Sequence, residues 1–271
     1  MAEHVKRWRV DGSKAVHLHD VDTRSRDGAP GGKHHTRTAT EPLVERLAEM
    51  QNRLWAEQQR SLLLVLQAMD AGGKDGTIRK VFTGVNPQGV RVASFKAPTA
   101  HELAHDFLWR IHREVPGRGE IGVFNRSHYE DVLIVRVEEL VPEPVWQGRY
   151  AHIRHFEDLL ADAGTTVVKV FLHISRDEQA ERFQARLDTP EKRWKFSAAD
   201  LDVRAKWDRY QEAYEDAINE TATERNPWYV VPADRKWYRD WAILQILLGT
   251  LEDMDPQYPD EEEGLDQVVI D

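Results

Sequence analysis

Residues 62–66 form an unbroken apolar run that leads directly into a glycine-rich turn at residues 69–77. A strand with water on one face would alternate apolar and polar residues, so this run predicts a strand that is buried on both faces. Such strands occur almost only in parallel sheets covered by helices. The chain is therefore expected to place the turn at the edge of a parallel sheet.

Four further segments read as strands of the same kind: residues 90–95, 121–124, 166–174 and 228–231. Helical patterns at residues 100–113 and 238–251 separate them. Strands that alternate with helices predict an α/β fold, with a parallel sheet and helices on both faces. In such folds ligands bind beyond the carboxyl ends of the strands.

A long amphipathic helix is predicted before the first strand, because Leu43, Leu47, Met50 and Leu54 recur every three to four residues. Thr40 is the expected N-cap, since its hydroxyl can accept a hydrogen bond from a free N–H of the first turn. A proline follows two residues later, where the missing N–H has no intrahelical partner.

The alternation stops at residues 178–219, where two charged helices are expected around a break at residues 188–190. Their polarity predicts a mobile helical lid rather than a core element. The expected organisation is an irregular N-terminal extension (1–39), a catalytic domain (40–251) with its lid at about 178–219, and an acidic tail (252–271).

The amino-acid composition excludes some kinds of catalysis. The chain has no cysteine, so disulfides and thiolate catalysis are excluded and any catalysis must use oxygen and nitrogen groups. No run is apolar and long enough to span a membrane, and the first thirty residues lack the apolar stretch of a signal peptide. The expected location is cytoplasmic, without a membrane partner.

Charge is distributed unevenly. The net charge of −10 argues against nucleic acid as a partner, but nine acids and no base lie in residues 252–271. The remaining residues are nearly balanced, so a site for a polyanion is possible on the body of the protein. The tail is interpreted as a solvated segment, or alternatively as one that screens the site or docks on a neighbour.

The turn after the first strand has the character of a phosphate cradle. Gly72 and Gly73 let backbone N–H groups approach an anion, and Lys74 adds a mobile positive charge at the start of the next helix. Two positions depart from the strict P-loop pattern: Ala68 replaces its first glycine, and Asp75 replaces the Ser or Thr that binds magnesium.

Asp70, within the loop, is the candidate for the missing magnesium ligand, because Mg²⁺ favours one or two carboxylates together with substrate phosphates. The alternative interpretation of the segment is a glycine-rich turn with an exposed lysine. The predicted phosphate-binding set is Gly72, Gly73, Lys74, Asp75, Gly76, Thr77, Arg79 and Lys80.

A second polar cluster ends the predicted strand at 121–124 and should face the same edge of the sheet. Arg126 can neutralise a transferring phosphoryl group, while Asn125, Glu130 or Asp131 can hold a metal or its waters. The two residues that follow Ser127, a histidine and a tyrosine, are interpreted as structural. Glu130 and Asp131 have an alternative role at the start of a helix.

In the lid, Arg182 and Arg186 are four residues apart and so share one helix face. That spacing suits closure over a chain of phosphates. Most of the other charged residues in this segment are interpreted as a solvated helix face.

Together these clusters resemble the polyphosphate kinase 2 family. The matching pieces follow the family's order and lie within about three quarters of the chain: residues 69–76, 95–99, 105–110, 124–131, 194–197 and 228–237.

The resemblance implies a P-loop kinase-like core with a helical lid, Mg²⁺ dependence, and a homodimer or homotetramer. It also implies reversible phosphoryl transfer between inorganic polyphosphate and nucleoside mono- or diphosphates. Asn125 stands where some members carry aspartate, and with Glu130 it resembles the subgroup that also acts on monophosphates.

The expected site residues fall into three groups. The catalytic residues are Asp70, Lys74, Arg126, Arg182 and Arg186; the metal ligands are Asp70 and Glu130; the nucleotide-binding residues are Phe95, Lys96, Pro98 and Asn125. A purely structural strand end is the alternative for residues 95–99.

Two other functions compete with this one. An ATP-dependent nucleotide kinase would share the cradle and the lid but take its phosphoryl group from ATP. A noncatalytic polyanion-binding module would bind phosphate chains without Mg²⁺-dependent turnover. Fold alone does not decide among the three.

Overall fold

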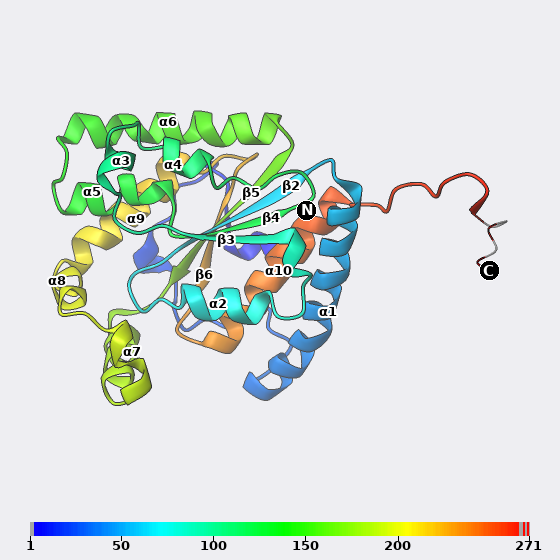
Figure 1. The fold of residues 1–271 in the computed structure, drawn as a ribbon. Helices are drawn as coiled ribbons and strands as arrows, with labels where there is room; N and C mark the ends of the chain where they lie inside the picture. Colours follow the sequence, from blue (N-terminus) through cyan, green and yellow to red (C-terminus); the bar gives the residue numbers. More distant parts are fainter. Residues whose placement is uncertain (1–2, 266–267, 269, 271) are drawn as a thin grey trace.

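The computed structural model describes residues 3–265, 268 and 270, which form one sheet between two layers of helices (Figure 1). The strand order among these residues is β1-β6-β5-β2-β4-β3. All neighbouring pairs are parallel except β1, which runs antiparallel to β6. The strands are β1 (Arg9–Val10), β2 (Ser61–Gln67), β3 (Val90–Ser94), β4 (Ile121–Asn125), β5 (Thr165–His173) and β6 (Trp228–Pro232).

The central position of β2 explains its apolar sequence. Every residue of β2 is buried, and Leu64 lies between Val123 of β4 and Val168 of β5. The five strands predicted from the sequence are confirmed to within one residue at each end. Strand β1 was missed because two residues are too few to show a period.

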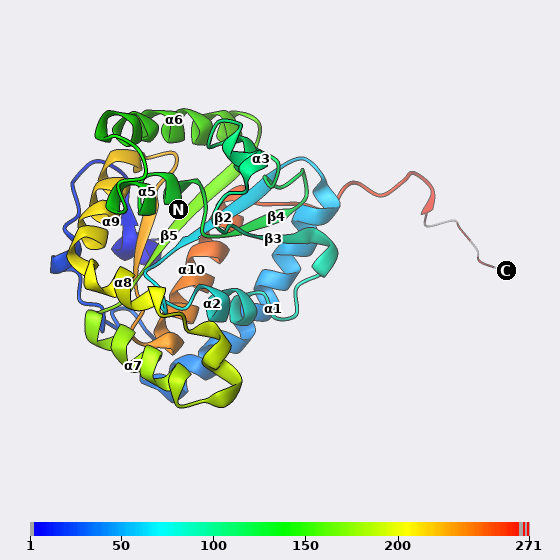
Figure 2. The ribbon, with the colours of Figure 1, turned by 60° about the vertical axis from the view of Figure 1, so that its left-hand side comes forward.

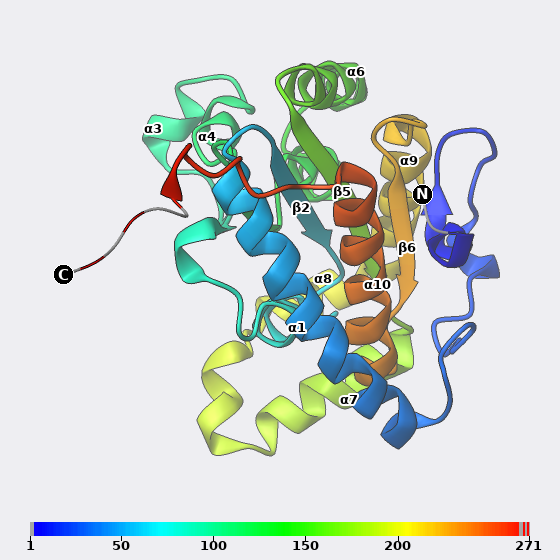
Figure 3. The ribbon, with the colours of Figure 1, turned by 90° about the vertical axis from the view of Figure 1, so that its right-hand side faces the viewer.

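Helices cover both faces of the sheet, as the sequence predicted. On one face lie α1 (Lys33–Glu57), α2 (Lys74–Val81) and α10 (Lys236–Met254); on the other lie α5 (Ile134–Val137), α6 (Glu143–Asp162) and α9 (Trp207–Thr221) (Figures 1 and 3). Helix α6 was not anticipated. Among the described residues, no helix is long and apolar enough to cross a membrane.

Helix α1 begins earlier than the sequence suggested. Its N-cap is Gly32, and Thr40 lies inside the helix, where its hydroxyl donates to the carbonyl of Thr36 across 2.6 Å. The prediction that Thr40 caps the helix is therefore wrong. Pro42 is also internal, and without an N–H it cannot donate to the carbonyl of Thr38. The predicted domain boundary at residue 40 falls within α1.

The continuous helix predicted for residues 100–113 is wrong. Two single turns occur instead, α3 (Ala100–Leu103) and α4 (Trp109–His112). Between them the carboxylate of Asp106 accepts a hydrogen bond from the N–H of Leu108, across 2.9 Å. Such a local side-chain bond offers the backbone an alternative to the helix.

The predicted lid is shorter in the structure. Residues 176–205 project from the body as α7 (Arg176–Leu187), η5 (Pro190–Lys195) and α8 (Ala199–Ala205) (Figure 2). Helix α9 instead buries a stripe of residues against the core, so its assignment to a mobile lid is wrong. That stripe consists of Trp207, Tyr210, Ala213, Tyr214, Ala217, Ile218 and Thr221.

The N-terminal segment packs against the core. Beside β1 it contains η1 (Glu3–Trp8) and η2 (Leu18–Asp20). Trp8 makes edge contacts with Tyr238 and Trp241, at ring distances of 6.2 and 5.7 Å, and its Nε1 donates to the hydroxyl of Tyr238. Residues 3–39 are thus more ordered than the irregular extension that the sequence predicted.

The acidic tail leaves α10 at the end of the molecule opposite the lid (Figure 3). Its first residues contact the end of α1, where Arg60 donates to the carbonyls of Met254 and Asp255. The described part of the tail therefore does not screen the carboxyl edge of the sheet. Asp266 and Asp271, two acids of the predicted tail, lie outside the described residues.

A buried histidine links the N-terminal segment to the sheet. His173, at the end of β5, is 6% exposed, and its Nε2 lies 3.0 Å from the carbonyl oxygen of Leu18. Burial lowers the pKa of His173 below its usual value of 6.5. The unfolded chain therefore takes up a proton here at a higher pH than the folded protein does.

We expect this difference to weaken the fold as the pH falls below about 6.5, because stability rises with pH wherever the unfolded state binds more protons. His173→Gln keeps a donor for Leu18 but cannot titrate. Denaturant unfolding between pH 5 and pH 8 should show a shallower loss of stability in the variant. Parallel pH profiles for the two proteins would contradict this.

Candidate active site

The glycine-rich turn is held in a left-handed geometry. Ala71 has φ 61° and Gly73 has φ 106°, immediately before α2 begins at Lys74. Gly73 suits this backbone angle, which side chains with a Cβ rarely adopt, and a Cβ there would also displace Nη1 of Arg239. Because α2 starts at this turn, its free N–H groups point toward the carboxyl edge of the sheet.

Arg182 braces this turn. Its Nη1 donates to the carbonyls of Ala71 and Gly72, both across 2.9 Å, and its Nη2 donates to the carbonyls of Ala233 and Asp234. Its Nε donates to Glu178. The side chain is buried and all five of its donors are used. A direct contact between Arg182 and phosphate would require some of these bonds to break, and stays a prediction.

Asp234 ties the brace to two other segments. Its carboxylate accepts hydrogen bonds from the hydroxyl of Thr23 and from the N–H of Ser175, each across 2.8 Å. Ser175 is the N-cap of α7, and Thr23 belongs to the N-terminal segment. The phosphate loop, the lid helix and the N-terminal segment are thus joined through Arg182 and Asp234.

The end of β4 meets the loop as the sequence predicted. Nη2 of Arg126 lies 3.0 Å from Oδ1 of Asp70, and Nδ2 of Asn125 donates to Oδ1 of Asp75 across 2.8 Å. Arg126 has φ 63°, a left-handed conformation that is uncommon outside glycine and persists only where the surrounding structure supports it. The backbone therefore bends to place this guanidinium over the loop.

Lys74 lies inside the same cluster. Its ammonium donates to the carbonyl of Ala68 across 2.9 Å. Burial lowers the pKa of Lys74, and the positive charge of Arg126 lowers it further, while the nearby carboxylates oppose both effects. A phosphate bound at the loop would stabilise the charged form of this lysine.

Two carboxylates, Asp70 and Glu130, face these cations. Burial raises the pKa of Glu130, and Asp70 raises it too, against the opposite influence of Arg126 and Lys74. Oriented so that both ends of its amide are bonded, Gln67 donates to Oε1 of Glu130 across 3.0 Å. The negative charges of Asp70 and Glu130 thus both interact with the positive charges of Lys74 and Arg126.

This donor set fits magnesium. Across the part of the chain that the structure describes, no group of three or more His, Asp or Glu side chains is arranged to hold a metal by itself. Mg²⁺ commonly takes one or two carboxylates and completes its shell with water and substrate phosphates. Asp70 and Glu130 could supply those carboxylates.

A buried network supports the loop that carries Arg126 and Glu130. Glu157 accepts from Nζ of Lys169 across 2.6 Å and from the hydroxyl of Tyr129 across 2.8 Å, and His128 Nε2 lies 3.3 Å away. These four side chains have essentially no exposed surface. The structural interpretation of His128 and Tyr129 agrees with this position. Asp131 is held outside the site, by an ion pair with Arg149.

The lid reaches the loop through its far end. Arg186 donates to the carbonyl of Lys195 and lies 3.8 Å from Asp200, and Lys195 lies 3.8 Å from Asp75. Arg186 is about a quarter exposed, so a substrate phosphate can reach it without breaking a buried network. The three predicted clusters therefore converge at one edge of the sheet.

Some predicted phosphate-binding residues lie elsewhere. Thr77 is fully buried, and Arg79 and Lys80 are exposed in the last turn of α2 rather than in the cradle. Thr77 lies in the first turn of α2, and Arg79 and Lys80 follow in its last turn.

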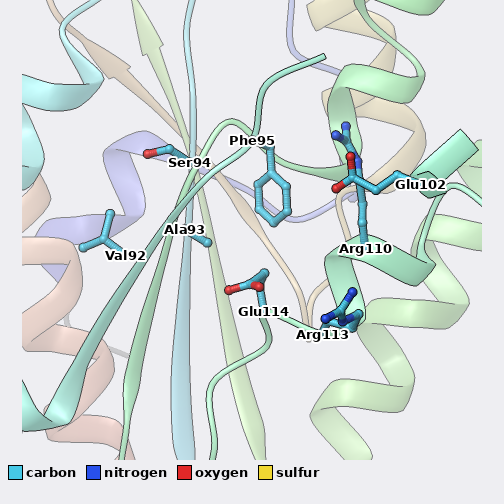
Figure 4. A pocket seen from close by; sticks show the side chains of 8 residues that line it. All are labelled: Val92, Ala93, Ser94, Phe95, Glu102, Arg110, Arg113 and Glu114. Atoms are coloured by element: carbon cyan, nitrogen blue, oxygen red, sulfur yellow. The ribbon is translucent and has the colours of Figure 1, made fainter. Parts of the chain in front are cut away.

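The predicted nucleotide-binding residues are separated. Phe95 packs edge-on against Phe124 and lines a pocket of about 390 Å³ beside β3, together with Ser94, Glu102 and Arg110 (Figure 4). Lys96 and Pro98 do not line this pocket, although the carbonyl of Lys96 accepts from Arg110. Asn125 instead lies at the phosphate loop.

Sequence reasoning missed four residues of the site: Asp200, Tyr214, Asp234 and Arg239. Burial raises the pKa of Tyr214, and the negative charges of Glu130 and Asp70 raise it too. The spacing of three and four residues along α9 could have revealed its buried face. The roles of Asp234 and Arg239 depend on tertiary contacts, for which no local pattern exists.

A glycine-rich turn between a central strand and a helix, with a lysine in the cradle and an arginine–carboxylate pair opposite, defines a phosphotransferase of the P-loop kinase type. The family model described as polyphosphate kinase 2 matches residues 32–259. The chain belongs to the polyphosphate kinase 2 family.

Relatives cover nearly the whole chain. An AMP/ADP-polyphosphate phosphotransferase from Meiothermus ruber is 57% identical over 98% of this chain and 100% of its own length. An ADP-polyphosphate phosphotransferase from Rhodopseudomonas palustris is 48% identical over 94% of this chain and 92% of its own length. The crystal structure of polyphosphate kinase 2 from Arthrobacter aurescens TC1 has a TM-score of 0.94 and 44% identity, and covers 98% of this chain and 95% of that chain.

The two lid arginines should respond differently to replacement by lysine. Lysine cannot reproduce the forked bonds of Arg182, so Arg182→Lys should lower the free energy of unfolding of the substrate-free protein by about 2 kcal/mol. Arg186→Lys should change it by less than about 0.5 kcal/mol. Urea unfolding measures both. Unchanged stability in Arg182→Lys would contradict the bracing role and favour a direct phosphate contact.

Proposed function

We propose that this protein transfers a phosphoryl group between inorganic polyphosphate and a nucleoside mono- or diphosphate, in the presence of Mg²⁺. The observation that carries the proposal is the ion pair of 3.0 Å between Arg126 and Asp70. It brings a candidate metal ligand and a phosphate-neutralising cation together beside the ammonium of Lys74. The names of the relatives support the choice of substrates.

The proposed step is an in-line displacement. A terminal phosphate oxygen of the nucleotide attacks the end phosphorus of the polyphosphate chain and forms a new P–O bond. The bridging P–O bond breaks and its electron pair stays on the oxygen of the shortened chain. Because the attacking oxygen is already anionic, no strong general base is required.

The protein's contribution is alignment and charge neutralisation. The free N–H groups at the start of α2 hold the phosphate oxygens, and Lys74 and Arg126 neutralise the charge on the transferring group. Asp70 and Glu130 would hold Mg²⁺, which when bound offsets the charge of the phosphates. Arg186 of the lid closes over the phosphates, while Arg182 keeps the loop in shape.

The donor distinguishes this function from that of an ATP-dependent nucleotide kinase. With polyphosphate as the sole donor and Mg²⁺ present, we expect ADP to be converted to ATP. Purified protein that turned over with ATP but not with polyphosphate would refute the proposal.

Asp70→Asn should lower kcat by about 100-fold or more, the scale seen when one group that stabilises charge is removed from an active site. Asn keeps the size of the side chain but loses the charge that attracts both Mg²⁺ and Arg126. Circular dichroism would verify folding. Near-normal turnover of a folded Asp70→Asn protein with polyphosphate and Mg²⁺ would contradict the assignment.

Asn125 is the candidate determinant of activity on monophosphates. Its amide donates to Asp75, so Asn125→Asp would set two carboxylates against each other at this contact. We expect kcat/KM for AMP to fall by about tenfold more than kcat/KM for ADP, because the shorter acceptor reaches the site through fewer phosphate contacts. An unchanged ratio of the two values would show that Asn125 does not select the acceptor.

A further inference from the structure

The N-terminal segment is hydrogen-bonded to the residues that follow β6. It runs beside β6 toward the start of α1 (Figure 3). Hydrogen bonds join residues 23–27 to residues 234–238: the N–H of Asp234 donates to the carbonyl of Thr23, the hydroxyl of Thr23 to Asp234, Nε of Arg235 to the carbonyl of Arg24, and the hydroxyl of Tyr238 to the carbonyl of Asp27. The segment therefore holds a stretch of backbone on which Arg182 is also anchored.

Thr23 contacts Asp234 at two points. Its carbonyl accepts from the N–H of Asp234 across 3.2 Å, and its hydroxyl donates to Oδ2 of Asp234 across 2.8 Å. The side chain of Asp234 is only 2% exposed, so water cannot readily replace a lost donor. Nε of Arg24 lies 3.6 Å from the same oxygen, which is too far for a hydrogen bond, and the Arg24 side chain is 60% exposed. The hydroxyl of Thr23 is therefore the close donor to this carboxylate oxygen.

Asp234 is connected to the phosphate loop through Arg182. Nη2 of Arg182 donates to the carbonyls of Ala233 and Asp234, across 2.6 and 3.2 Å. Nη1 of the same guanidinium donates to the carbonyls of Ala71 and Gly72. Because a guanidinium is planar and rigid, a displacement on one side of it moves the groups bonded on the other side. A shift of Asp234 would therefore disturb the loop at the left-handed Ala71.

The same carboxylate holds the start of the lid helix. Oδ1 of Asp234 accepts from the N–H of Ser175, the N-cap of α7, across 2.8 Å. A negative charge is favourable at this place, because the N-terminus of a helix carries a partial positive charge. One turn into α7, Nε2 of Gln179 donates to the carbonyl of Asp70 across 2.9 Å. The phosphate loop and the lid helix thus depend on one common anchor.

We propose that Thr23 is a positioning residue for phosphoryl transfer. Its hydroxyl holds Asp234, and Asp234 fixes both the phosphate loop, through Arg182, and the start of α7. In this role Thr23 acts through Asp234 and does not touch the substrate. The inference rests on the proposed function and extends the machinery of the reaction to the N-terminal segment, outside the catalytic domain that the sequence predicted.

Thr23→Val removes the hydroxyl and keeps the branched shape of the side chain. We expect kcat with polyphosphate to fall by about tenfold, because small misplacements of groups that align substrate are costly even when they arise far from the reacting atoms. The KM for ADP should change by less than about twofold. Thr23→Ser keeps the hydroxyl and should restore kcat to within about twofold of the wild-type value.

Asn219 offers a matched control for loosening the N-terminal segment. Its side chain holds Val16 by two hydrogen bonds, one to the N–H and one to the carbonyl, each across 2.9 Å. Asn219→Leu removes both bonds but leaves the contact between Thr23 and Asp234 in place. We expect this variant to keep kcat within about twofold of the wild type, even where urea unfolding shows a loss of stability as large as that of Thr23→Val.

Hydrogen exchange supplies a readout that does not depend on turnover. In the substrate-free protein, Thr23→Val should speed amide exchange at residues 69–77 and 175–182 by about threefold or more, because the bonds that hold these segments are weakened. Thr23→Ser and Asn219→Leu should leave exchange in both segments close to that of the wild type. Mass spectrometry of the matching peptides would measure the rates.

Four results would each overturn the positioning role. They are normal kcat in Thr23→Val, failure of Thr23→Ser to restore kcat, an equal fall of kcat in Asn219→Leu, and unchanged exchange at residues 69–77 in Thr23→Val. A wild type without polyphosphate turnover would instead refute the proposed function. In that case the exchange rates still decide whether Thr23 holds the loop, so the two failures are distinguishable.

Discussion

The geometry of the site depends on one buried guanidinium. Arg182 bonds to two carbonyls of the phosphate loop and to two carbonyls after β6, and so fixes the distance between them. The loop needs this support because Ala71 adopts a left-handed conformation that a residue with a Cβ rarely takes. Without the brace, relaxation of Ala71 would turn the backbone N–H groups away from the anion.

Electrostatic stress accompanies this geometry. Lys74, Arg126 and Arg239 lie close to the same loop, and burial together with the positive charge of Arg126 lowers the pKa of Lys74. Burial also disfavours the negative charge of Glu130 and so raises the pKa of its carboxyl group. Substrate phosphates and a divalent cation would offset both. The substrate-free protein is thus organised around charges that its ligands are needed to neutralise, which is a form of preorganisation.

Sequence patterns predicted the sheet well because each strand is marked by the residues of its own short segment. The apolar run of β2 and the largely apolar segment of β5 are typical of strands buried on both faces, and the glycine-rich turn after β2 indicated a phosphate loop. The placement of Arg126 at the same edge as the glycine-rich loop also followed, since parallel strands end at one edge. Helix boundaries were less certain: the start of α1 has no side-chain cap, and an aspartate interrupts the helix expected at 100–113.

The remaining errors concern tertiary contacts. The arginine pattern of α7 suggested two equivalent lid residues, but only the structure shows that Arg182 is buried and that Arg186 is accessible. Tyr214 is a different case, because the spacing of three and four residues in the buried stripe of α9 was present in the sequence and was overlooked among its charged residues. The contact of Thr23 with Asp234 joins residues 211 positions apart, so no local pattern indicates it.

The contacts after β6 affect the order in which the protein can mature. Arg182 donates to carbonyls that lie 51 and 52 residues further along the chain. Asp234 in turn accepts a hydrogen bond from Thr23, near the N-terminus. During synthesis on the ribosome, the loop and its lysine emerge long before the residues that lock them. A nascent chain that ends before β6 would carry every part of the phosphate cradle but lack the carbonyls that hold Arg182 in place, so the site can be completed only after these residues have been synthesised.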